Sequence, residues 1–349
     1  MPTQVSSLTI DVEDWFHILD CDAAPPMERW PALEVRVEKN TTEILDILAS
    51  YGIKATFFWL GWVAERHKHL VRRCLNEGHE IASHGYGHLL AYKVGPKIFQ
   101  QDITRAKSVL EEIIGAPVEG FRAPGFGIKK NCGWAFDIIK ESGYIYDSSV
   151  FPGTREHGGI VDSPLEMHFI ETQNGPLPEI PMSMVEIFSH RTNLFGGGYL
   201  RLASKSLIRW GIKKIHAKGR SLVVYIHPRD IDLHQPRLPL GLRRRFKCYV
   251  NLKGTIVKLR WLCQHYSFST MAEIAQRFVS QFSWAEVINE KQLSLQGQNT
   301  GPETTSRIRS VIVPGTTYSG TDRAGKSSAG LDSIKTGKLR TVRLVSYSY

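Results

Sequence analysis

Cysteine is scarce in this sequence of 349 residues. The cysteines are odd in number, lie far apart and form no Cys-x-x-Cys pair; the five are Cys21, Cys74, Cys132, Cys248 and Cys263. A disulfide framework or a thiolate zinc site needs cysteines in organised pairs. We therefore expect neither, and the pattern favours a reducing compartment.

Long apolar runs are also missing. The longest mostly apolar stretch, residues 55–64, is too short to cross the ~30 Å hydrocarbon core of a bilayer. The first residues, MPTQVSSLTIDVEDWF, contain no basic segment followed by an apolar core, so we expect no secretory signal peptide. The sequence thus predicts a soluble, cytoplasmic protein without a transmembrane segment.

Acidic residues are depleted at one end of the chain. Residues 291–349 hold nine Lys and Arg but three acids, whereas the first 290 residues hold 35 and 31. The first 290 residues are therefore close to neutral in net charge, which argues against a dedicated nucleic-acid-binding protein. The end segment also has 24 Ser, Thr and Gly among its 59 residues, too little apolar surface to offset its ordering entropy. We predict a catalytic domain over residues 1–280 and a mostly disordered basic tail over 281–349.

Short β-rich runs alternate with helical runs along the first 280 residues. The pattern predicts strands at 6–10, 54–60, 80–83, 118–121, 144–146, 177–185 and 221–226, and helices at 37–50, 62–76, 97–114, 133–142, 202–217 and 252–266. Such alternation is typical of an α/β fold with parallel strands joined by helices. Several strands end in polar residues, and in an α/β barrel that edge is where active sites are built.

Two histidines follow the strand at 80–83. His84 and His88 are four residues apart in the glycine-rich segment HGYGH. Imidazole is a good ligand for zinc and similar ions, and this spacing in a helical turn places both rings on one side. Two loop histidines without a metal are an equally good interpretation of this segment alone.

Three carboxylates follow the first strand. In an extended chain Asp11 and Glu13 point to one side, whereas Asp14 joins them only if the loop bends. One carboxylate added to two histidines makes a common metal site with open positions, and a second could act as a base. An acidic helix-capping turn is the alternative.

Three further polar residues end predicted strands. Arg122 could hold an acid in its ionised state, or be a surface arginine before a turn. Asp147 could orient a histidine, or cap the next segment. His227, held by the following proline, is placed like a catalytic acid or base, although a lone histidine there is more often structural.

The order of these five clusters resembles that of the polysaccharide deacetylase family, carbohydrate esterase family four, which includes chitin and peptidoglycan deacetylases. The resemblance covers roughly residues 5–275; its motifs are Thr9-Ile10-Asp11-Val12-Glu13-Asp14, His84-Gly85-Tyr86-Gly87-His88, Arg122-Ala123-Pro124, Tyr146-Asp147-Ser148-Ser149 and His227-Pro228. Segments DVEDWFH, GGGYLRL and HPRDID are similar to a bacterial subgroup associated with exopolysaccharide synthesis.

The resemblance implies a distorted (β/α) barrel with seven parallel strands, fewer than the regular eight. It implies a metal-dependent attack of water on an acetamido carbonyl. Each role is carried over by motif: Asp11 matches the catalytic base, Arg122 the residue that holds it, His227 the acid for the departing amine, Asp147 the carboxylate that tunes it, and His84 and His88 the metal ligands.

Two positions depart from the family pattern. Many members have two adjacent aspartates in the first motif, whereas here Val12 follows Asp11, so the third ligand is Glu13, with Asp14 as the alternative. The subgroup usually has an aromatic residue after the proline of its last motif, where this chain has Arg229. That replacement favours an anionic glycan.

These expectations describe a hydrolase that removes acetyl groups from an N-acetylated glycan, with Zn²⁺ or Co²⁺ as cofactor. The expected setting is exopolysaccharide or cell-surface biosynthesis, with its assembly machinery as partner. A hydrolase of a small cyclic amide or ureide and an inactive glycan-binding module are the alternatives. The aromatics beside the motifs are candidates for sugar stacking or core packing: Trp15, Phe16, Tyr86, Phe126 and Tyr199.

Overall fold

The computed structural model describes residues 6–188, 190–282, 307–314 and 339–347. The strands are β1 (Ser6–Val12), β2 (Thr56–Trp59), β3 (Glu80–Ser83), β4 (Gly120–Phe121), β5 (Tyr146–Asp147), β6 (His168–Ile170), β7 (Leu177–Glu179), β8 (Val185–Ile187), β9 (His190–Thr192), β10 (Leu222–Ile226), β11 (Arg307–Pro314) and β12 (Leu339–Ser346). The α-helices are α1 (Val37–Ser50), α2 (Gly61–Arg66), α3 (Lys68–Asn76), α4 (Ala91–Ile114), α5 (Trp134–Glu141), α6 (Gly197–Leu202), α7 (Lys205–Ala217), α8 (Leu242–Tyr249), α9 (Lys253–His265) and α10 (Met271–Val279). Four short 3₁₀ helices are η1 (Met27–Ala32), η2 (Pro124–Phe126), η3 (Lys130–Cys132) and η4 (Pro228–Ile231).

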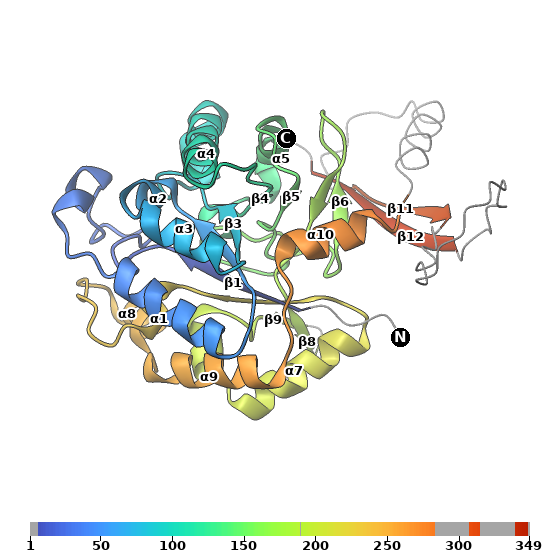
Figure 1. Ribbon diagram of the computed structural model, residues 1–349. Helices are drawn as coiled ribbons and strands as arrows, with labels where there is room; N and C mark the ends of the chain where they lie inside the picture. Colours follow the sequence, from blue (N-terminus) through green and yellow to red (C-terminus); the bar gives the residue numbers. More distant parts are fainter. Residues whose placement is uncertain (1–5, 189, 283–306, 315–338, 348–349) are drawn as a thin grey trace, which may run out of the picture.

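Seven parallel strands form the centre of the molecule. Their order is β10-β1-β2-β3-β4-β5-β7, which confirms the predicted α/β fold with seven parallel strands. β6 then pairs antiparallel with β7, and beyond it β12 and β11 extend the sheet. Helices surround the strands, with α4 and α5 above them and α7 and α9 below them in Figure 1.

The barrel is distorted because its two edges, β10 and β7, do not pair through backbone hydrogen bonds. A side chain crosses the gap instead: the Ser183 hydroxyl accepts a hydrogen bond from the Val223 amide at 2.8 Å. The same hydroxyl donates to the Ser221 carbonyl at 3.3 Å. The segment after β7 therefore lies against β10 without becoming part of the ladder.

The central strands are buried on both faces. Every residue of β1, β2 and β10 is buried, and the three strands are rich in Val, Ile, Leu and Phe. Parallel strands have this apolar composition because helices cover their outer face while side chains fill the inside of the barrel. Polar side chains inside the barrel are therefore exceptions, and they gather at the carboxyl ends of the strands.

Two predicted helices differ in detail from the structure. The predicted helix 62–76 is interrupted at His67, which separates α2 from α3. The predicted helix 97–114 begins earlier, at Ala91, and bends at Gly95, whose φ is 75°. A positive φ followed by Pro96 cannot continue a regular helix, so the first turn lies at an angle to the rest.

Part of the predicted disordered tail is ordered, which corrects that prediction. Residues 307–314 and 339–346 form the antiparallel pair β11–β12, and β12 pairs in parallel with β6. Val342 and Leu344 are buried against Phe169 and Phe282. In β12 the run that contains Val342 and Leu344 buries apolar surface once β6 supplies an edge, which the composition of the whole tail conceals. Residues 283–306 and 315–338 lie outside the described residues.

Within the described part of the chain, no helix combines the length and the apolar character needed to cross a bilayer.

The end of β12 is expected to contribute to stability. Tyr347 is buried, stacks on Phe136 at 5.3 Å between ring centroids, and its hydroxyl lies 2.8 Å from the Ser163 hydroxyl. Tyr347→Ala should lower the free energy of unfolding by about 3 kcal/mol, because a buried aromatic ring is removed. Chemical denaturation checks this result. The matched control is Phe188→Ala, whose ring is 94% exposed; equal stability of both variants would contradict the packing of β12.

Candidate active site

Five polar residues lie at or just after the ends of parallel strands. Asp11 belongs to β1, His84 follows β3, Arg122 follows β4, Asp147 ends β5 and His227 follows β10. Parallel strands bring these ends to one edge of the sheet. Four of the five form one cluster, described below, and Asp147 lies apart from it.

Asp11 is held by a buried arginine. Arg122 Nη1 donates to Asp11 Oδ1 at 2.7 Å and to the Thr9 hydroxyl at 2.8 Å. Its Nε and Nη2 reach the backbone carbonyl and hydroxyl of Ser148, and its guanidinium packs 4.0 Å from the centre of the Phe58 ring. The expected contact between Arg122 and Asp11 is present, and the arginine is too firmly held to leave it.

Glu13, His84 and His88 form a candidate metal centre. One ligand atom from each lies within 4.8 Å of the others, and all three residues are buried. Glu13 Oε2 lies 2.7 Å from His88 Nε2. His84 Nδ1 is 2.7 Å from the carbonyl oxygen of Arg122, which fixes the proton on Nδ1 and leaves Nε2 free as a ligand. This donor set suits zinc or a similar ion.

Asp14 lies away from this cluster. Its carboxylate accepts hydrogen bonds from the backbone amides of Trp15, Arg36 and Val37 at 2.8–3.0 Å. Two of those amides open helix α1, so Asp14 has the helix-capping role that was the alternative for the acidic cluster. The geometry therefore favours Glu13 over Asp14 as the carboxylate ligand.

The two histidines lie in a loop and not in the helical turn that their spacing suggested. Gly85 and His88 both have positive φ, 74° and 55°. The Asp102 carboxylate of α4 shapes this loop by accepting hydrogen bonds from the amides of Tyr86 and Gly87, at 2.9 and 2.8 Å. A Cβ on Gly85 would lie 2.7 Å from Asp102 Oδ2, so this close approach requires glycine.

His227 contacts both acidic residues of the site. Its Nε2 lies 3.8 Å from Asp11 Oδ2 and 3.5 Å from Glu13 Oε1. Its Nδ1 lies 2.9 Å from Asp230 Oδ2, and Arg201 pairs with the other oxygen of Asp230. The prediction that Asp147 tunes His227 is wrong, because Asp230 holds that position.

Asp147 belongs to a separate buried pair. Its carboxylate accepts hydrogen bonds from the hydroxyl and the amide of Ser149, at 2.6 and 3.1 Å. It lies beside Glu179 across the β5–β7 ladder. Burial and the Asp147 carboxylate raise the pKa of Glu179 well above its usual value. The raised pKa favours the protonated form of Glu179 inside the barrel.

The sequence analysis assigned no role in the site to Asp230, Arg201 or Asp102. A signal for Asp230 existed, because it stands three residues after His227 and closes the first turn of η4, where it accepts a hydrogen bond from the His227 amide at 3.0 Å. This reciprocal i, i+3 arrangement is a known helix-start pattern. Arg201 lies in the segment GGGYLRL, which was singled out only for its similarity to the bacterial subgroup, and nothing local marks Asp102.

The surroundings favour the ionised form of Asp11 and the protonated form of His227. Burial opposes ionisation of Asp11, but the positive charges of Arg122 and His227 outweigh it and lower the pKa of Asp11. Burial also disfavours the charged form of His227, but Glu13 and Asp230 outweigh it and raise the pKa of His227. Burial lowers the pKa of His84 to about 4, so this ring is neutral, as a metal ligand must be.

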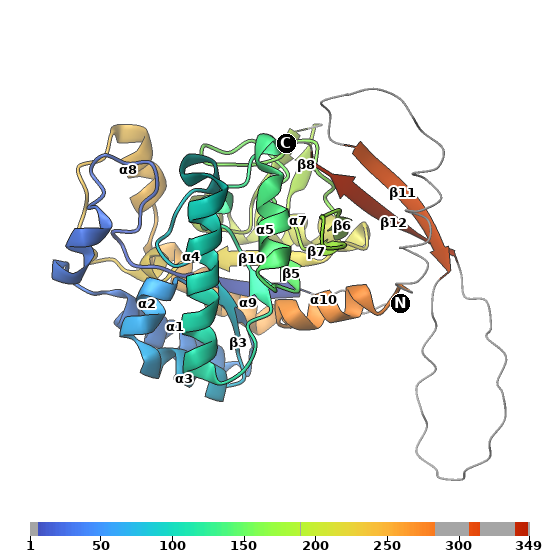
Figure 2. The same ribbon diagram turned by 90° about the horizontal axis from the view of Figure 1, so that it is seen from above.

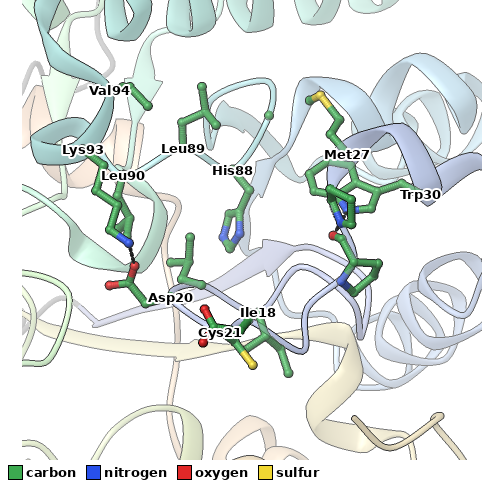
Figure 3. A pocket seen from close by; sticks show the side chains of 15 residues that line it. Ile18, Asp20, Cys21, Met27, Trp30, His88, Leu89, Leu90, Lys93 and Val94 are labelled. Carbon is green, nitrogen blue, oxygen red and sulfur yellow. Dashed lines mark hydrogen bonds and ion pairs between the residues drawn. The ribbon is translucent and has the colours of Figure 1, made fainter. Parts of the chain in front are cut away.

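A pocket of about 670 Å³ adjoins the site at His88. Figure 3 shows the His88 imidazole projecting into it, with Trp30 and Met27 on one side and the Asp20–Lys93 ion pair on the other. Of the aromatics considered for sugar stacking, Trp15, Phe16, Tyr86 and Phe126 are buried, as core packing predicts, whereas Tyr199 is 51% exposed.

Two family models match the chain side by side. Residues 22–144 match the family described as polysaccharide deacetylase, and residues 148–276 match a domain of unknown function, DUF3473. His84, His88 and Arg122 lie in the first segment, whereas Arg201, His227 and Asp230 lie in the second. The site is thus assembled from both segments and from β1, which precedes them.

Curated relatives are similar over the first segment. A peptidoglycan-N-acetylglucosamine deacetylase of Bacillus cereus is 36% identical over 104 residues, 30% of this chain and 47% of the relative. A chitooligosaccharide deacetylase of Sinorhizobium fredii is 32% identical over 103 residues, 29% of this chain and 45% of the relative. The chain thus spans about half the length of these two relatives.

A solved structure is similar over most of the fold. It is a Mycobacterium smegmatis protein provisionally named a polysaccharide deacetylase, 20% identical, with a TM-score of 0.53. The match covers 80% of this chain and 91% of that chain. At this level of identity the likeness concerns the fold.

Proposed function

Because the chain contains a polysaccharide deacetylase domain, we propose that it hydrolyses the acetamido groups of an N-acetylated glycan. The observation that carries this proposal is the position of His227 Nε2, 3.8 Å from Asp11 Oδ2 and 3.5 Å from Glu13 Oε1, the latter in the candidate metal centre. Asp11, a proton acceptor, and His227, a proton donor, thereby lie next to each other. Hydrolysis of an amide needs both.

Glu13, His84 and His88 fit a divalent cation, for which we propose Zn²⁺, with Co²⁺ as the alternative. The fit rests on the donor set and on the Arg122 carbonyl, which keeps the His84 Nε2 free of a proton. A bound divalent ion would polarise the acetamido carbonyl and make a water molecule more acidic.

We assign proton abstraction to Asp11. Arg122 occupies Oδ1, which leaves Oδ2 facing His227 and the metal centre. The same arginine keeps the carboxylate ionised, so that Oδ2 accepts the proton of the attacking water. Because Arg122 has further hydrogen bonds to Thr9 and Ser148, the direction in which Oδ2 points is determined before substrate binds.

We assign protonation of the departing nitrogen to His227. Asp230 accepts from Nδ1, which directs Nε2 toward the reaction space, and Arg201 keeps Asp230 ionised. The raised pKa of His227 favours the protonated form of the ring. An amine is a poor leaving group unless it is protonated, so cleavage of the amide bond depends on this donor.

His227→Ala is expected to lower kcat on an N-acetylated sugar by at least about 100-fold. The leaving group of an activated acetyl ester needs no proton. The loss of kcat on such an ester should therefore be at least about tenfold smaller than the loss on the N-acetylated sugar. Both rates are measured as acetate or phenolate release. Equal losses on the two substrates would show that His227 has a structural role, and the acid would have to be sought elsewhere.

The proposed activity is tested by acetate release from chito-oligosaccharides and from peptidoglycan fragments, with purified protein that contains its metal. The control is the Asp11→Asn variant. Ring opening of hydantoin-type cyclic amides, followed as the appearance of a carboxylic acid, without acetate release from any glycan, would favour the alternative hydrolase. Glycan binding without hydrolysis of any of these substrates would favour a binding module.

We further propose that the protein acts in exopolysaccharide or cell-surface glycan synthesis, in the cytoplasm, alongside the assembly machinery. The similarity of the segments 11–17, 196–202 and 227–232 to the exopolysaccharide-associated subgroup supports this setting. Deletion of the gene in its host, followed by analysis of the N-acetyl content of the surface glycans, tests it.

A further inference from the structure

Arg229 reaches into the active site beside the candidate metal centre. Its Nε lies 3.4 Å from Glu13 Oε1, and the side chain is 20% exposed. This Nε is buried and has no hydrogen-bond partner among the described residues. A guanidinium carries five donors in a planar fork that matches a carboxylate. Arg229 therefore offers donors at the edge of the reaction space.

The carboxylates around Arg229 are committed to other partners. Asp11 pairs with Arg122, and Asp230 pairs with Arg201 and His227. Glu13 contacts His88 and belongs to the candidate metal centre. Glu13, the carboxylate that Arg229 pairs with, is thereby shared with His88 and the candidate metal centre, where a divalent ion would add positive charge. Like charges in a buried site are unfavourable unless an anion joins them.

The surface outside Arg229 is basic as well. Residues 233–272 contain eight Lys and Arg and no Asp or Glu. Helix α8 lies in this acid-free segment, with Arg243 and Arg245 exposed. Figure 2 shows α8 at the same end of the molecule as the segment between β1 and α1.

Helix α8 is fixed to the wall of the pocket. Arg244 donates to the backbone carbonyls of Leu19 and Asp20, two residues that line the pocket. The helix thus adds positive charge beside the approach to the site, where Asp20 and Asp22 also line the pocket, and positive charge attracts anionic ligands.

We propose that Arg229 binds a carboxylate of the substrate, and hence that the glycan is acidic, with a uronic acid next to the N-acetylated sugar. A carboxylate matches this arginine because a guanidinium can donate two parallel hydrogen bonds to the two oxygens of a carboxylate. The acid-free segment, with α8, guides the same polyanionic chain toward the site. This inference rests on the proposed deacetylase function.

The test uses an oligosaccharide of alternating N-acetylglucosamine and glucuronic acid, together with its carboxyl-reduced form, which differs only in charge. The unaltered protein should show a kcat/KM about tenfold or more higher on the acidic form, as expected for one charge-assisted hydrogen-bonded pair. Arg229→Gln should abolish this ratio, mainly through KM of the acidic substrate. Arg229→Lys should restore part of it.

A binding measurement accompanies the rates. Calorimetry with metal-free protein should show the acidic oligosaccharide bound about tenfold more weakly by Arg229→Gln. The control Arg277→Gln, an exposed arginine of α10, should keep the original ratio and affinity. Hydrolysis of both oligosaccharides at equal rates by the unaltered protein would overturn this inference and leave the deacetylase proposal standing.

Two other outcomes are informative. If no N-acetylated glycan releases acetate, the proposed function fails, whereas equal affinity of Arg229→Gln and the unaltered protein for the acidic oligosaccharide overturns the role of Arg229 by itself. If Arg243→Gln with Arg245→Gln loses binding to phosphatidylglycerol vesicles but keeps the full preference for the acidic oligosaccharide, α8 serves a membrane surface and its guiding role is wrong.

Discussion

His84→Ala and His88→Ala are each expected to lower the affinity for a divalent ion by more than about 100-fold and to abolish hydrolysis. Each removes one of only three protein donors at the candidate centre, and two donors do not hold zinc in competition with water. The melting temperature of the metal-free protein should change little, because the loop that carries both rings is held by Asp102 through backbone amides.

Metal content after dialysis, measured by elemental analysis, checks this result. The control is His69→Ala. The His69 ring is 65% exposed and pairs with Glu38 of α1. The carboxylate ligand is tested with the same method. Glu13→Gln should lose the ion, whereas Asp14→Asn should keep it and lose stability at the start of α1. Full metal content in both histidine variants would remove the site altogether.

Asp11→Asn should lower kcat by about 1,000-fold, within the range for removal of a general base, while the ion still binds. The asparagine keeps the shape of the side chain but no longer accepts the proton. It also leaves the buried Arg122 without its counter-charge, which by itself costs stability. The double variant Asp11→Asn with Arg122→Met separates the two effects, because removing both charges should recover stability without recovering the rate.

The pH dependence of the rate distinguishes the two proton carriers. Because the pKa of Asp11 is lowered, the base stays ionised down to below the usual aspartate range, and the rate falls only there. Because the pKa of His227 is raised, the acid stays protonated to above the usual histidine range, and the rate falls beyond it. Asp11→Asn should remove the acidic limb. A profile that keeps both limbs in this variant would contradict the assignment of the base.

The positions of most site residues could be predicted because they follow strand ends. A run such as 221–226 followed by His227 indicates both a buried strand and the edge at which it stops. Residues in five such places must converge if the strands are parallel, so Asp11, Arg122 and His227 could be brought together on paper. The same logic misplaced Asp147, because its carboxylate accepts from Ser149 beside Glu179, whereas Asp230 accepts from His227 Nδ1.

Which partner each residue takes depends on distances that no pattern encodes. Glu13 and Asp14 are adjacent and chemically alike, yet one turns toward His88 and the other toward the amides of α1. The choice follows from where α1 begins in space. The ordering of β12 likewise depends on the free edge of β6, about 170 residues away in the chain, and not on the composition of the tail.

The sequence by itself determined the alternation of strands and helices, the number of parallel strands and the residues able to do chemistry, because hydrophobic period and residue type are local properties. Only the tertiary structure decided which carboxylate faces the histidines, that Asp230 and not Asp147 accepts from His227, and that Arg229 reaches Glu13 of the candidate metal centre. These outcomes follow from long-range packing, which fixes the direction of a side chain to within a few ångströms, and pairings of charged groups are decided at that scale.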